Sequence, residues 1–484
     1  MNGYGNLIGD VISYRGIPHE VISPVTGCSI GIVPLVTKED IDQALLDFAE
    51  RSPILPRRTV FAFLQRLKEQ LVARRDLFFE KTYLETGFVS RDSREIIDSS
   101  IEFLNDFEIY VQDKAFREQI IRHSYSSGSD RDIRITQRPF HCVAAVVPQN
   151  ASLSLSITII ASALYAGSRV ILRPSLQNGP TGALLAEAVM RSDPPPGSII
   201  IANCLARDFV DACCASESVD LIHYIGSNQY AQSVFTQAFS AGKICLLDGQ
   251  GNGLLYLDDT FPLADAVSII TSGATRYNGE TCTSINGVLI KDIIYEPVKE
   301  ALVDSFRNLH LGPPLDQGIH VGPLFSEKQA LSLQRIIQET LGAQVLCGGE
   351  REGAYFKPAV VEGVNLGDPI VCEGVFGPVI WIRSVSESDL WAWFKGNRFP
   401  LSDTILSTNH NLIRTFAENS RAARICVNED PSVESMFEPW GGYPPSGLNP
   451  VSVWVEKYRQ TFQLDGRLRE IMAIPFPAWQ GESG

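Results

Sequence analysis

The sequence predicts an α/β protein built around a doubly wound, mostly parallel sheet, and three observations support this prediction. At 484 residues the chain is too long for one core, so it divides into two or three domains. Short apolar runs alternate with helix-length segments in its middle part; the runs are Val143–Val147, Val170–Leu172, Ile199–Ala202, Leu221–Tyr224 and Ile244–Leu247. A second α/β region follows from about Gly251 to Tyr443. Such sheets bind nucleotide cofactors at the carboxyl ends of their strands.

The segments before the sheet predict a hairpin followed by helices. Val21 to Val36 alternates β-prone runs with turn residues, which is typical of a hairpin. Apolar residues at helical spacing predict helices over Thr37–Glu50, Pro56–Glu85 and Arg91–Gln112. The proline at position 56 suits a first helical turn, and Gly87 suits a helix end.

The last part of the chain predicts a strand that can pair with another molecule. After Gly447 comes a strand-like run, Arg459–Gln463, and then a proline-rich end. A strand of this kind can add to the sheet edge of a partner chain.

Composition excludes several classes of partner. The 41 Lys and Arg against 56 Asp and Glu give a formal charge of −15, without a basic stripe, so nucleic acid and anionic membrane are unexpected partners. The longest apolar stretch, Val143 to Leu172, is interrupted by Pro148, Gln149 and Asn150, so no membrane span is expected. None of the ten cysteines forms a CxxC pair, which predicts no metal site and a reducing, cytoplasmic compartment.

Cys282 is the leading candidate for chemistry. It follows an Asn278-Gly279 bend and sits among small polar residues, whose amides and hydroxyls favour the reactive thiolate. A free cysteine is more often a buried structural residue, so Cys282 as a nucleophile needs support from the rest of the chain.

That support comes from six short strings in order, which resemble motifs of the aldehyde dehydrogenase superfamily. They are Val147-Pro148-Gln149-Asn150, Arg173-Pro174-Ser175, Gly226-Ser227, Asn278-Gly279-Glu280-Thr281-Cys282, Glu373-Gly374-Val375-Phe376-Gly377-Pro378-Val379, and Pro439-Trp440-Gly441-Gly442-Tyr443 with Ser446-Gly447. Each string alone is weak, but their order and spacing make the resemblance specific over nearly the whole chain.

The resemblance implies a Rossmann-type cofactor domain, an α/β catalytic domain and a small β oligomerisation element. The corresponding segments are residues 1–120 and 141–249 for the first, 250–445 for the second, and 121–140 with 446–484 for the third. Homodimers or homotetramers are the family norm, so an oligomer is expected.

The resemblance also implies roles for individual residues. Cys282 would attack an aldehyde, and the Asn150 side chain with the Cys282 backbone N–H would stabilise the oxyanion. The cofactor, NAD or NADP, would be bound by Pro148, Gln149, Arg173, Ser175, Gly226, Ser227, Glu373 and Phe376. Arg173 takes the place of a family lysine, and Leu176 stands where many NAD-preferring members carry a glutamate, a combination that admits NADP.

Two departures from the family pattern affect the chemistry. Leu247 occupies the position of the general-base glutamate, and Gly374 that of the glutamate that binds the nicotinamide ribose. Asp248 replaces the base only if the strand bulges or the alignment slips by one residue, since neighbours on a strand face opposite ways. Glu280, two residues before Cys282, is a second possible base, although it need not face the thiol.

Three functions remain open from the sequence. The first is NAD(P)-dependent oxidation of an aldehyde to a carboxylic acid through a thiohemiacetal and a thioester on Cys282. The second is an acylating or thioester-reducing relative, in which a thiol such as coenzyme A takes the acyl group, because Leu247 cannot activate water. The third is a catalytically weak binding protein with this fold.

Overall fold

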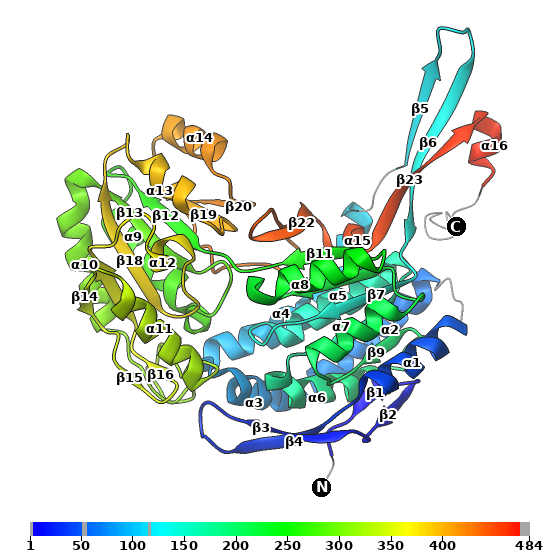
Figure 1. Cartoon of the computed structure of the whole chain (residues 1–484), viewed down its shortest axis with the longest axis horizontal. Helices are drawn as coiled ribbons and strands as arrows, with labels where there is room; N and C mark the ends of the chain where they lie inside the picture. The colour runs from blue at the N-terminus through cyan, green and yellow to red at the C-terminus, as the bar shows by residue number, and fades with distance from the viewer. Residues whose placement is uncertain (1–2, 51–55, 115–117, 475–484) are drawn as a thin grey trace.

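The computed structural model describes residues 3–50, 56–114 and 118–474, and it shows two α/β bodies and a projecting β-arm (Figure 1). Each body is built on its own large sheet, and the arm is a smaller sheet that extends away from both. This confirms the predicted fold class.

The first body holds a nine-stranded sheet with the order β2-β1-β9-β8-β7-β10-β11-β22-β21. Its strands are β1 (Asn6–Ile8), β2 (Val11–Ser13), β7 (Cys142–Val146), β8 (Arg169–Arg173), β9 (Ile199–Ile201), β10 (Leu221–Ile225), β11 (Ile244–Asp248), β21 (Trp440–Gly442) and β22 (Gly447–Ser452). The run from β9 to β11 is parallel, as predicted, and the flanking strands pair antiparallel. The carboxyl ends of the parallel strands therefore lie along one edge.

Helices cover both faces of this sheet, so it is doubly wound. Their bounds are α1 (Lys38–Glu50), α2 (Arg57–Ala73), α3 (Arg75–Thr86), α4 (Ser90–Lys114), α5 (Ser152–Ala166), α6 (Gly179–Arg191), α7 (Ala206–Ala215), α8 (Asn228–Ser240) and α15 (Trp454–Lys457). Val143 and Ala145 pack with α2, α4, α5 and α6, whereas Cys142 and Ala144 pack with α1, α7 and α8. This alternation is the two-residue period of a strand buried on both sides.

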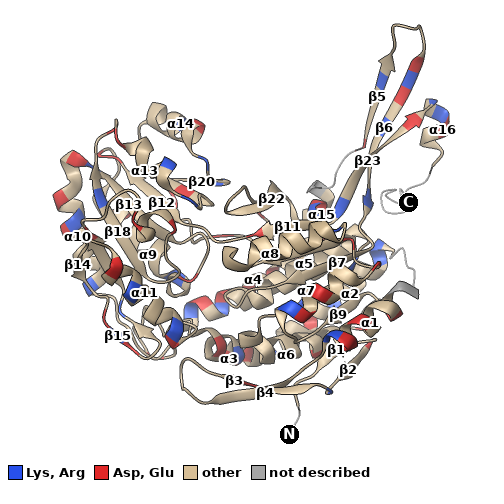
Figure 2. Cartoon of the chain, viewed as in Figure 1, with Lys and Arg blue, Asp and Glu red and all other residues tan. Residues whose placement is uncertain are grey.

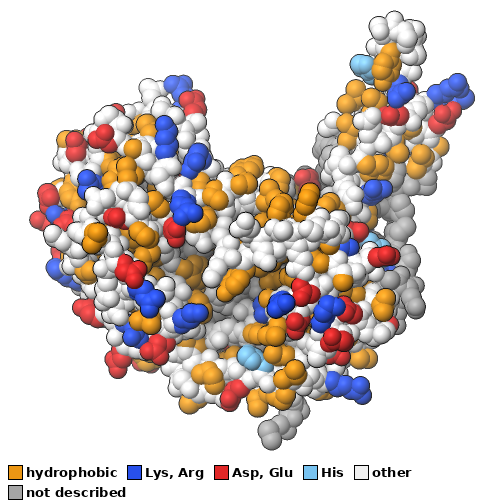
Figure 3. All heavy atoms as spheres, in the orientation of Figure 1, with side chains coloured by type: hydrophobic (Ala, Val, Ile, Leu, Met, Phe, Trp, Pro, Cys, Tyr) orange, Lys and Arg blue, Asp and Glu red, His pale blue; other side chains and the backbone are white. Residues whose placement is uncertain are grey.

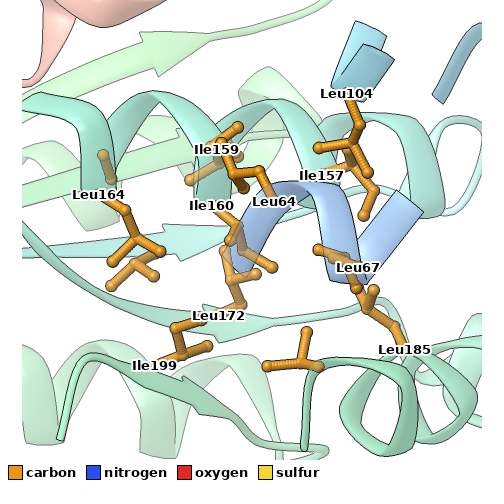
Figure 4. Close-up of a cluster of buried hydrophobic side chains, with 14 of the residues drawn as sticks. Leu64, Leu67, Leu104, Ile157, Ile159, Ile160, Leu164, Leu172, Leu185 and Ile199 are labelled. Carbon is orange, nitrogen blue, oxygen red and sulfur yellow. The ribbon is translucent and has the colours of Figure 1, made fainter. Parts of the chain in front are cut away.

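Helix α5 lies at the centre of the first core (Figure 4). Its buried residues run almost all the way round, so it is a core helix and not an amphipathic surface helix. Ile157 and Ile160 pack there with Leu64 of α2 and Leu172 of β8. The rigid packing of α5 fixes the loop just before it, which carries Asn150.

One helix prediction was wrong in its extent. The segment Pro56–Glu85 was expected to be a single helix, but it divides into α2 and α3 at Arg74, whose φ of −118° and ψ of 17° are not helical. The Arg74 side chain bonds back to Gln70, which satisfies part of the end of α2. Such a break leaves no strong composition signal, because Arg74 and its neighbours are all good helix formers.

The second body contains a seven-stranded sheet with the order β14-β17-β18-β13-β12-β19-β20. Its strands are β12 (Gly253–Leu257), β13 (Ile285–Lys291), β14 (Gln344–Cys347), β17 (Ala359–Glu362), β18 (Val379–Val385), β19 (Ser402–Leu406) and β20 (Arg424–Val427). Its helices are α9 (Leu263–Thr275), α10 (Tyr295–Arg307), α11 (Glu327–Glu339), α12 (Pro369–Cys372), α13 (Leu390–Gly396) and α14 (His410–Asn419), and β15 (Arg351–Glu352) pairs with β16 (Tyr355–Phe356).

The remaining strands form two smaller sheets. The predicted amino-terminal hairpin is β3 (Ile17–Ile22) with β4 (Ser29–Leu35). The arm has the order β23-β6-β5, from β5 (Gln119–Ser124), β6 (Asp130–Pro139) and β23 (Arg459–Gly466), followed by α16 (Leu468–Met472). The expected strand after Gly447 thus pairs with β6 of its own chain.

The segment expected to belong as a whole to the arm, residues 446–484, is divided in the structure. Strand β22 pairs with β11 of the first body, through Leu247 with Leu448 and Asp248 with Gly447. Only the part from β23 onward joins the arm, and residues 475–484 lie outside the described residues. Strand β22 pairs with the edge of β11 that β10 does not occupy. No local sequence feature reveals this pairing.

Positively and negatively charged residues are mixed along the described chain. Figure 2 shows Lys and Arg interspersed with Asp and Glu over both bodies. Within the described ranges, none of the helices is both long and apolar enough to traverse a bilayer.

Candidate active site

A cavity of about 440 Å³ brings the predicted functional residues together. Cys282 lies on its wall with Asn150, Gly226 and Asp248. These residues come from the loop before β13 and from the ends of β7, β10 and β11. The cavity therefore spans the carboxyl edge of the first sheet and the adjoining loop of the second body.

The loop before Cys282 is held in an unusual conformation. Tyr277, Asn278 and Gly279 have φ angles of 51°, 56° and 68°, all in the left-handed region that is costly for residues other than glycine. Three hydrogen bonds of the Asn278 side chain stabilise this conformation. Nδ2 donates to the carbonyls of Gly87 (3.2 Å) and Pro323 (2.9 Å), and Oδ1 accepts from the Gly322 N–H (2.9 Å). The bend aims the chain so that Cys282 reaches the cavity.

A glycine lies directly against the backbone of Cys282. A Cβ placed on Gly251 would lie 1.9 Å from the carbonyl oxygen of Cys282. No side chain fits at that distance, so this close approach needs glycine. Gly251 was not recognised from the sequence, where it is one of several glycines after a strand.

Asn150 is tied to the same loop. Its side-chain Nδ2 donates to the carbonyl of Glu280 at 2.9 Å, which links the end of β7 to the segment two residues before Cys282. The amide has a second N–H that this bond leaves available. Asn150 and the thiol therefore share one wall, as expected.

The environment of the thiol differs from the sequence expectation. Polar neighbours were expected to favour the thiolate, but burial raises the pKa of the Cys282 thiol well above its usual range, and the carboxylates of Glu434 and Asp248 raise it further. The local sequence is polar, whereas the fold removes water and adds negative charge. Cys282 at rest is therefore a protonated thiol at neutral pH.

Asp248, and not Leu247, faces this cavity. Strand β11 pairs with β10 in an unbroken register from Leu221↔Ile244 to Ile225↔Asp248, so no bulge is needed. Leu247 packs into the cluster covered by α1, α7 and α8, and by alternation Asp248 faces the other way. The leucine at the family base position is thus a packing residue.

The Asp248 carboxylate is the centre of a buried hydrogen-bond network. Oδ2 lies 2.6 Å from His223 Nε2, and both oxygens accept from Asn449 Nδ2 at 2.9 Å. On the far side of the ring, His223 Nδ1 lies 3.0 Å from the Tyr458 hydroxyl. Asn449 Oδ1 accepts in turn from Lys457 Nζ at 2.8 Å. None of His223, Asn449, Lys457 and Tyr458 was singled out from the sequence.

Glu280, the other carboxylate considered as a base, is not among the residues lining this cavity. Its Oε1 accepts from the Phe325 N–H at 3.2 Å, and burial raises the pKa of its carboxyl group well above the usual range. This hydrogen bond makes Glu280 part of the support of the Cys282 loop, away from the cavity wall.

The predicted cofactor turn lies at the edge of the sheet. Gly226 and Ser227 join β10 to α8, and the Ser227 hydroxyl caps this helix by accepting from the Gln229 N–H at 3.2 Å. The Gly226 N–H donates to the Asp248 carbonyl at 2.9 Å, so the turn is anchored to β11. Pro148, Gln149 and Phe376 line the same cavity. The backbone N–H groups at the start of a helix that follows a parallel strand suit a pyrophosphate. These residues therefore fit a dinucleotide cofactor.

Three other residues predicted to bind the cofactor lie outside the cavity wall. Arg173 ends β8, the neighbour of β7, and Ser175 follows it; Arg173 Nε donates to the Cys204 carbonyl at 3.1 Å. Glu373 pairs with Arg398 at 2.6 Å. Gly374, with φ of 72°, has the side-chain oxygens of Asn252 and Asn286 only 2.7 Å from where a Cβ would stand, so a glutamate does not fit this backbone.

Carboxylates that the sequence analysis did not identify also line the cavity. They are Glu95 on α4, and Glu434 and Glu438 in the loop before β21. That loop precedes a recognised motif, but a glutamate in a polar loop gives no signal by itself. Among the described residues, no group of three or more His, Cys, Asp or Glu side chains is placed to hold a metal ion.

Comparison with known proteins decides the family. The model of the aldehyde dehydrogenase family matches residues 14–464. The chain belongs to the aldehyde dehydrogenase family. It is an NAD(P)-dependent oxidoreductase that acts on aldehydes.

Individual members of the family are distant in sequence and close in fold. A lactaldehyde dehydrogenase from Methanocaldococcus jannaschii is 26% identical over 441 residues, which cover 89% of this chain and 92% of the relative. The NADP-dependent succinate-semialdehyde dehydrogenase of Escherichia coli is 24% identical, with 89% and 90% covered. The structure of a glyceraldehyde-3-phosphate dehydrogenase from M. jannaschii complexed with NADP superimposes with a TM-score of 0.83 at 24% identity, over 92% of this chain and 98% of that one.

Proposed function

We propose that this aldehyde dehydrogenase oxidises its substrate to a carboxylic acid through a thioester on Cys282, with Asp248 as the base that releases the acid. The observation that carries the proposal is the shared cavity, whose wall holds the thiol, Asn150, the Gly226-Ser227 turn and a carboxylate. These are the groups that attack, oxyanion stabilisation, cofactor binding and hydrolysis require.

The first step joins Cys282 to the aldehyde. The Cys282 thiol gives its proton to solvent water, and the sulfur then adds to the carbonyl carbon and gives a thiohemiacetal oxyanion. Asn150 donates its second N–H to this oxygen, and the Cys282 backbone N–H donates as well. Each such donor is worth about 10²–10³ in rate.

The bound cofactor supplies the hydride acceptor, and this chain holds and orients it. We assign the pyrophosphate to Gly226 and Ser227 at the start of α8, the adenosine to Arg173 and Ser175, and the nicotinamide side to Pro148, Gln149 and Phe376, with Glu373 beside it. Arg173 supplies a positive charge, and Leu176 stands at the position where many NAD-preferring members carry a glutamate. This combination supports acceptance of NADP as well as NAD.

The second step frees the acid. Asp248 takes a proton from water, which attacks the thioester carbonyl, and Cys282 leaves as the thiolate. His223 Nε2 and Asn449 Nδ2 hold the carboxylate in place. General-base catalysis of this kind contributes about 10²–10⁴. Leu247 takes no part, because it lies on the other face of β11.

One observation favours a second candidate function, transfer of the acyl group to a thiol such as coenzyme A. Both Asp248 oxygens already accept hydrogen bonds, which reduces their capacity to take a further proton. A thiol acceptor needs less activation than water.

One experiment separates these outcomes from a protein with little turnover. Purified enzyme is mixed with an aldehyde panel and NAD or NADP, with and without coenzyme A, while reduced cofactor and the mass of Cys282 are followed together. Steady turnover without thiol supports the acid-forming enzyme. A single burst that only thiol relieves supports acyl transfer. Absence of any adduct at Cys282, or turnover that survives Cys282→Ala, contradicts the mechanism.

We also propose that the arm mediates a homodimer or homotetramer. Strands β23 and β5 are the two edges of its sheet, and exposed apolar side chains lie on it and on the helix that follows: Ile120, Ile121, Leu468 and Met472. Figure 3 shows apolar side chains gathered along this arm. Open strand edges with apolar side chains are suited to pairing with a second copy. The described cysteines are all free, which supports a reducing, cytoplasmic location.

A further inference from the structure

The cavity around Cys282 is lined by negative charge. Glu95, Asp248, Glu434 and Glu438 are on its wall, whereas none of the described residues that line it is Lys, Arg or His. An aldehyde that carries a carboxylate or phosphate would therefore enter this cavity against four carboxylates and without a partner for its own charge.

The two arginines nearest these carboxylates are already engaged. Arg424 Nη1 bonds to Glu434 Oε1 at 3.0 Å and to the Pro431 carbonyl at 2.7 Å, and its Nη2 lies 3.5 Å from Glu438 Oε2. One positive charge is thus shared between two glutamates. The guanidinium has no fork left to bind an anionic substrate.

Arg276 is engaged in the same way on the other side. It pairs with Glu95 and also with Asp92, whose Oδ1 is 3.4 Å from Nε. The arginine side chain is only 9% exposed, so substrate does not reach it. Asp92 also accepts from Arg91 Nε at 3.0 Å, so this cluster is balanced, and the negative charge of the wall comes from Asp248, Glu434 and Glu438.

Aromatic rings complete the lining. Tyr277, Trp440 and Trp454 face the same cavity as these carboxylates. Aromatic faces attract alkylated ammonium groups, and carboxylates beside them add Coulombic attraction. This combination attracts a cationic group and repels an anionic one.

We propose that the substrate is an aldehyde whose chain ends in a positively charged amino or quaternary ammonium group, held by Glu434 and Glu438 against the aromatic wall. The inference rests on the proposed function, since it names the substrate of that same cavity. It differs from what the E. coli relative is named for, because succinate semialdehyde carries a carboxylate.

The test compares aldehydes that differ in charge and little else. One has a trimethylammonium group three methylenes from the aldehyde carbon, the second is its uncharged tert-butyl isostere, and the third is succinate semialdehyde. We expect kcat/KM to fall in that order, with a difference between the first two that shrinks at high salt. Equal values, or a preference for succinate semialdehyde, would overturn the inference.

Two variants assign the preference to specific groups. Glu434→Gln and Glu438→Gln remove charge with little change of shape, and each should lower the ratio of kcat/KM for the cationic over the uncharged aldehyde by roughly 5- to 10-fold. Glu300→Gln is the matched control, because Glu300 is an exposed residue of α10 outside the cavity. A ratio unchanged in both cavity variants would contradict the assignment.

Binding of the corresponding alcohols separates this inference from the proposed function. The three alcohols cannot react, so calorimetry measures their dissociation constants from the enzyme whether or not any aldehyde turns over. Tighter binding of the cationic alcohol supports the inference even if no thioester forms on Cys282. Tighter binding of the anionic alcohol overturns it even if the enzyme makes acids at a high rate.

Discussion

Asp248 and His223 form a buried hydrogen bond, 2.6 Å from Oδ2 to Nε2, at the cavity that holds Cys282. The pair joins two neighbouring parallel strands, from the end of β11 to the middle of β10. Through His223 the carboxylate is connected to Tyr458, the residue directly before the arm strand β23. We propose that this carboxylate, held by a histidine, acts in place of the family glutamate whose position Leu247 occupies.

Asp248→Asn should convert the enzyme to one that stalls after the first step. Attack and hydride loss do not need this carboxylate, so a burst of reduced cofactor remains, but steady hydrolysis falls by about 10²–10⁴. Rapid-quench mass spectrometry would show the acyl group retained on Cys282. Asp265→Asn, at an exposed residue of α9, is the control and should behave as wild type. An Asp248→Asn enzyme with an unchanged steady rate would assign the base elsewhere.

His223→Gln tests whether the histidine positions Asp248. We expect a loss of stability of about 1–3 kcal/mol, since a buried bond to a carboxylate is lost, and a slower hydrolytic step with a changed pH dependence. The pH profile of the steady rate, compared with that of the burst, gives the answer. A histidine with a purely structural role would lower stability and leave both profiles unchanged.

Alkylation of Cys282 by iodoacetamide should be slow at neutral pH and strongly pH-dependent. Because burial and the nearby carboxylates raise the pKa of the thiol, only the small thiolate fraction reacts, and the rate should rise about tenfold per pH unit between pH 7 and 9. Glu434→Gln removes a negative charge beside the sulfur, lowers its pKa and should speed alkylation several-fold at a fixed pH. A plateau below pH 8 would show that the resting thiol is already activated.

Gly251→Ala should disable catalysis without blocking cofactor binding. The added Cβ would stand 1.9 Å from the Cys282 carbonyl oxygen, so the nucleophile loop must move. A displacement near 1 Å costs on the order of 10² in rate. Titration of NADPH fluorescence measures cofactor binding on the same sample. Gly3→Ala, where the nearest atom is 3.6 Å away, is the matched control; equal activity of the two variants would contradict this role.

The fold was open to prediction because its signals are local. Each parallel strand is a short apolar run, and each crossover leaves a helix-length gap, so β7 to β11 were located to within a residue or two. The arm segment 121–140 was expected only from the resemblance to the family. The division of Pro56–Glu85 at Arg74 and the pairing of β22 with β11 were missed, because long-range packing decides them and composition does not.

The sequence by itself determined the family, and it predicted Cys282 as nucleophile, Asn150 as oxyanion donor and Gly226-Ser227 as the cofactor turn, because each lies in a short string with a recognisable order. Only the tertiary structure decided which of two adjacent residues lines the cavity, and it placed Asp248 there and Leu247 in the core. It also brought Glu95, Glu434 and Glu438 to one wall from distant parts of the chain. Desolvation and Coulomb forces act through space, so the state of the thiol and the charge of its cavity exist only once the chain has folded.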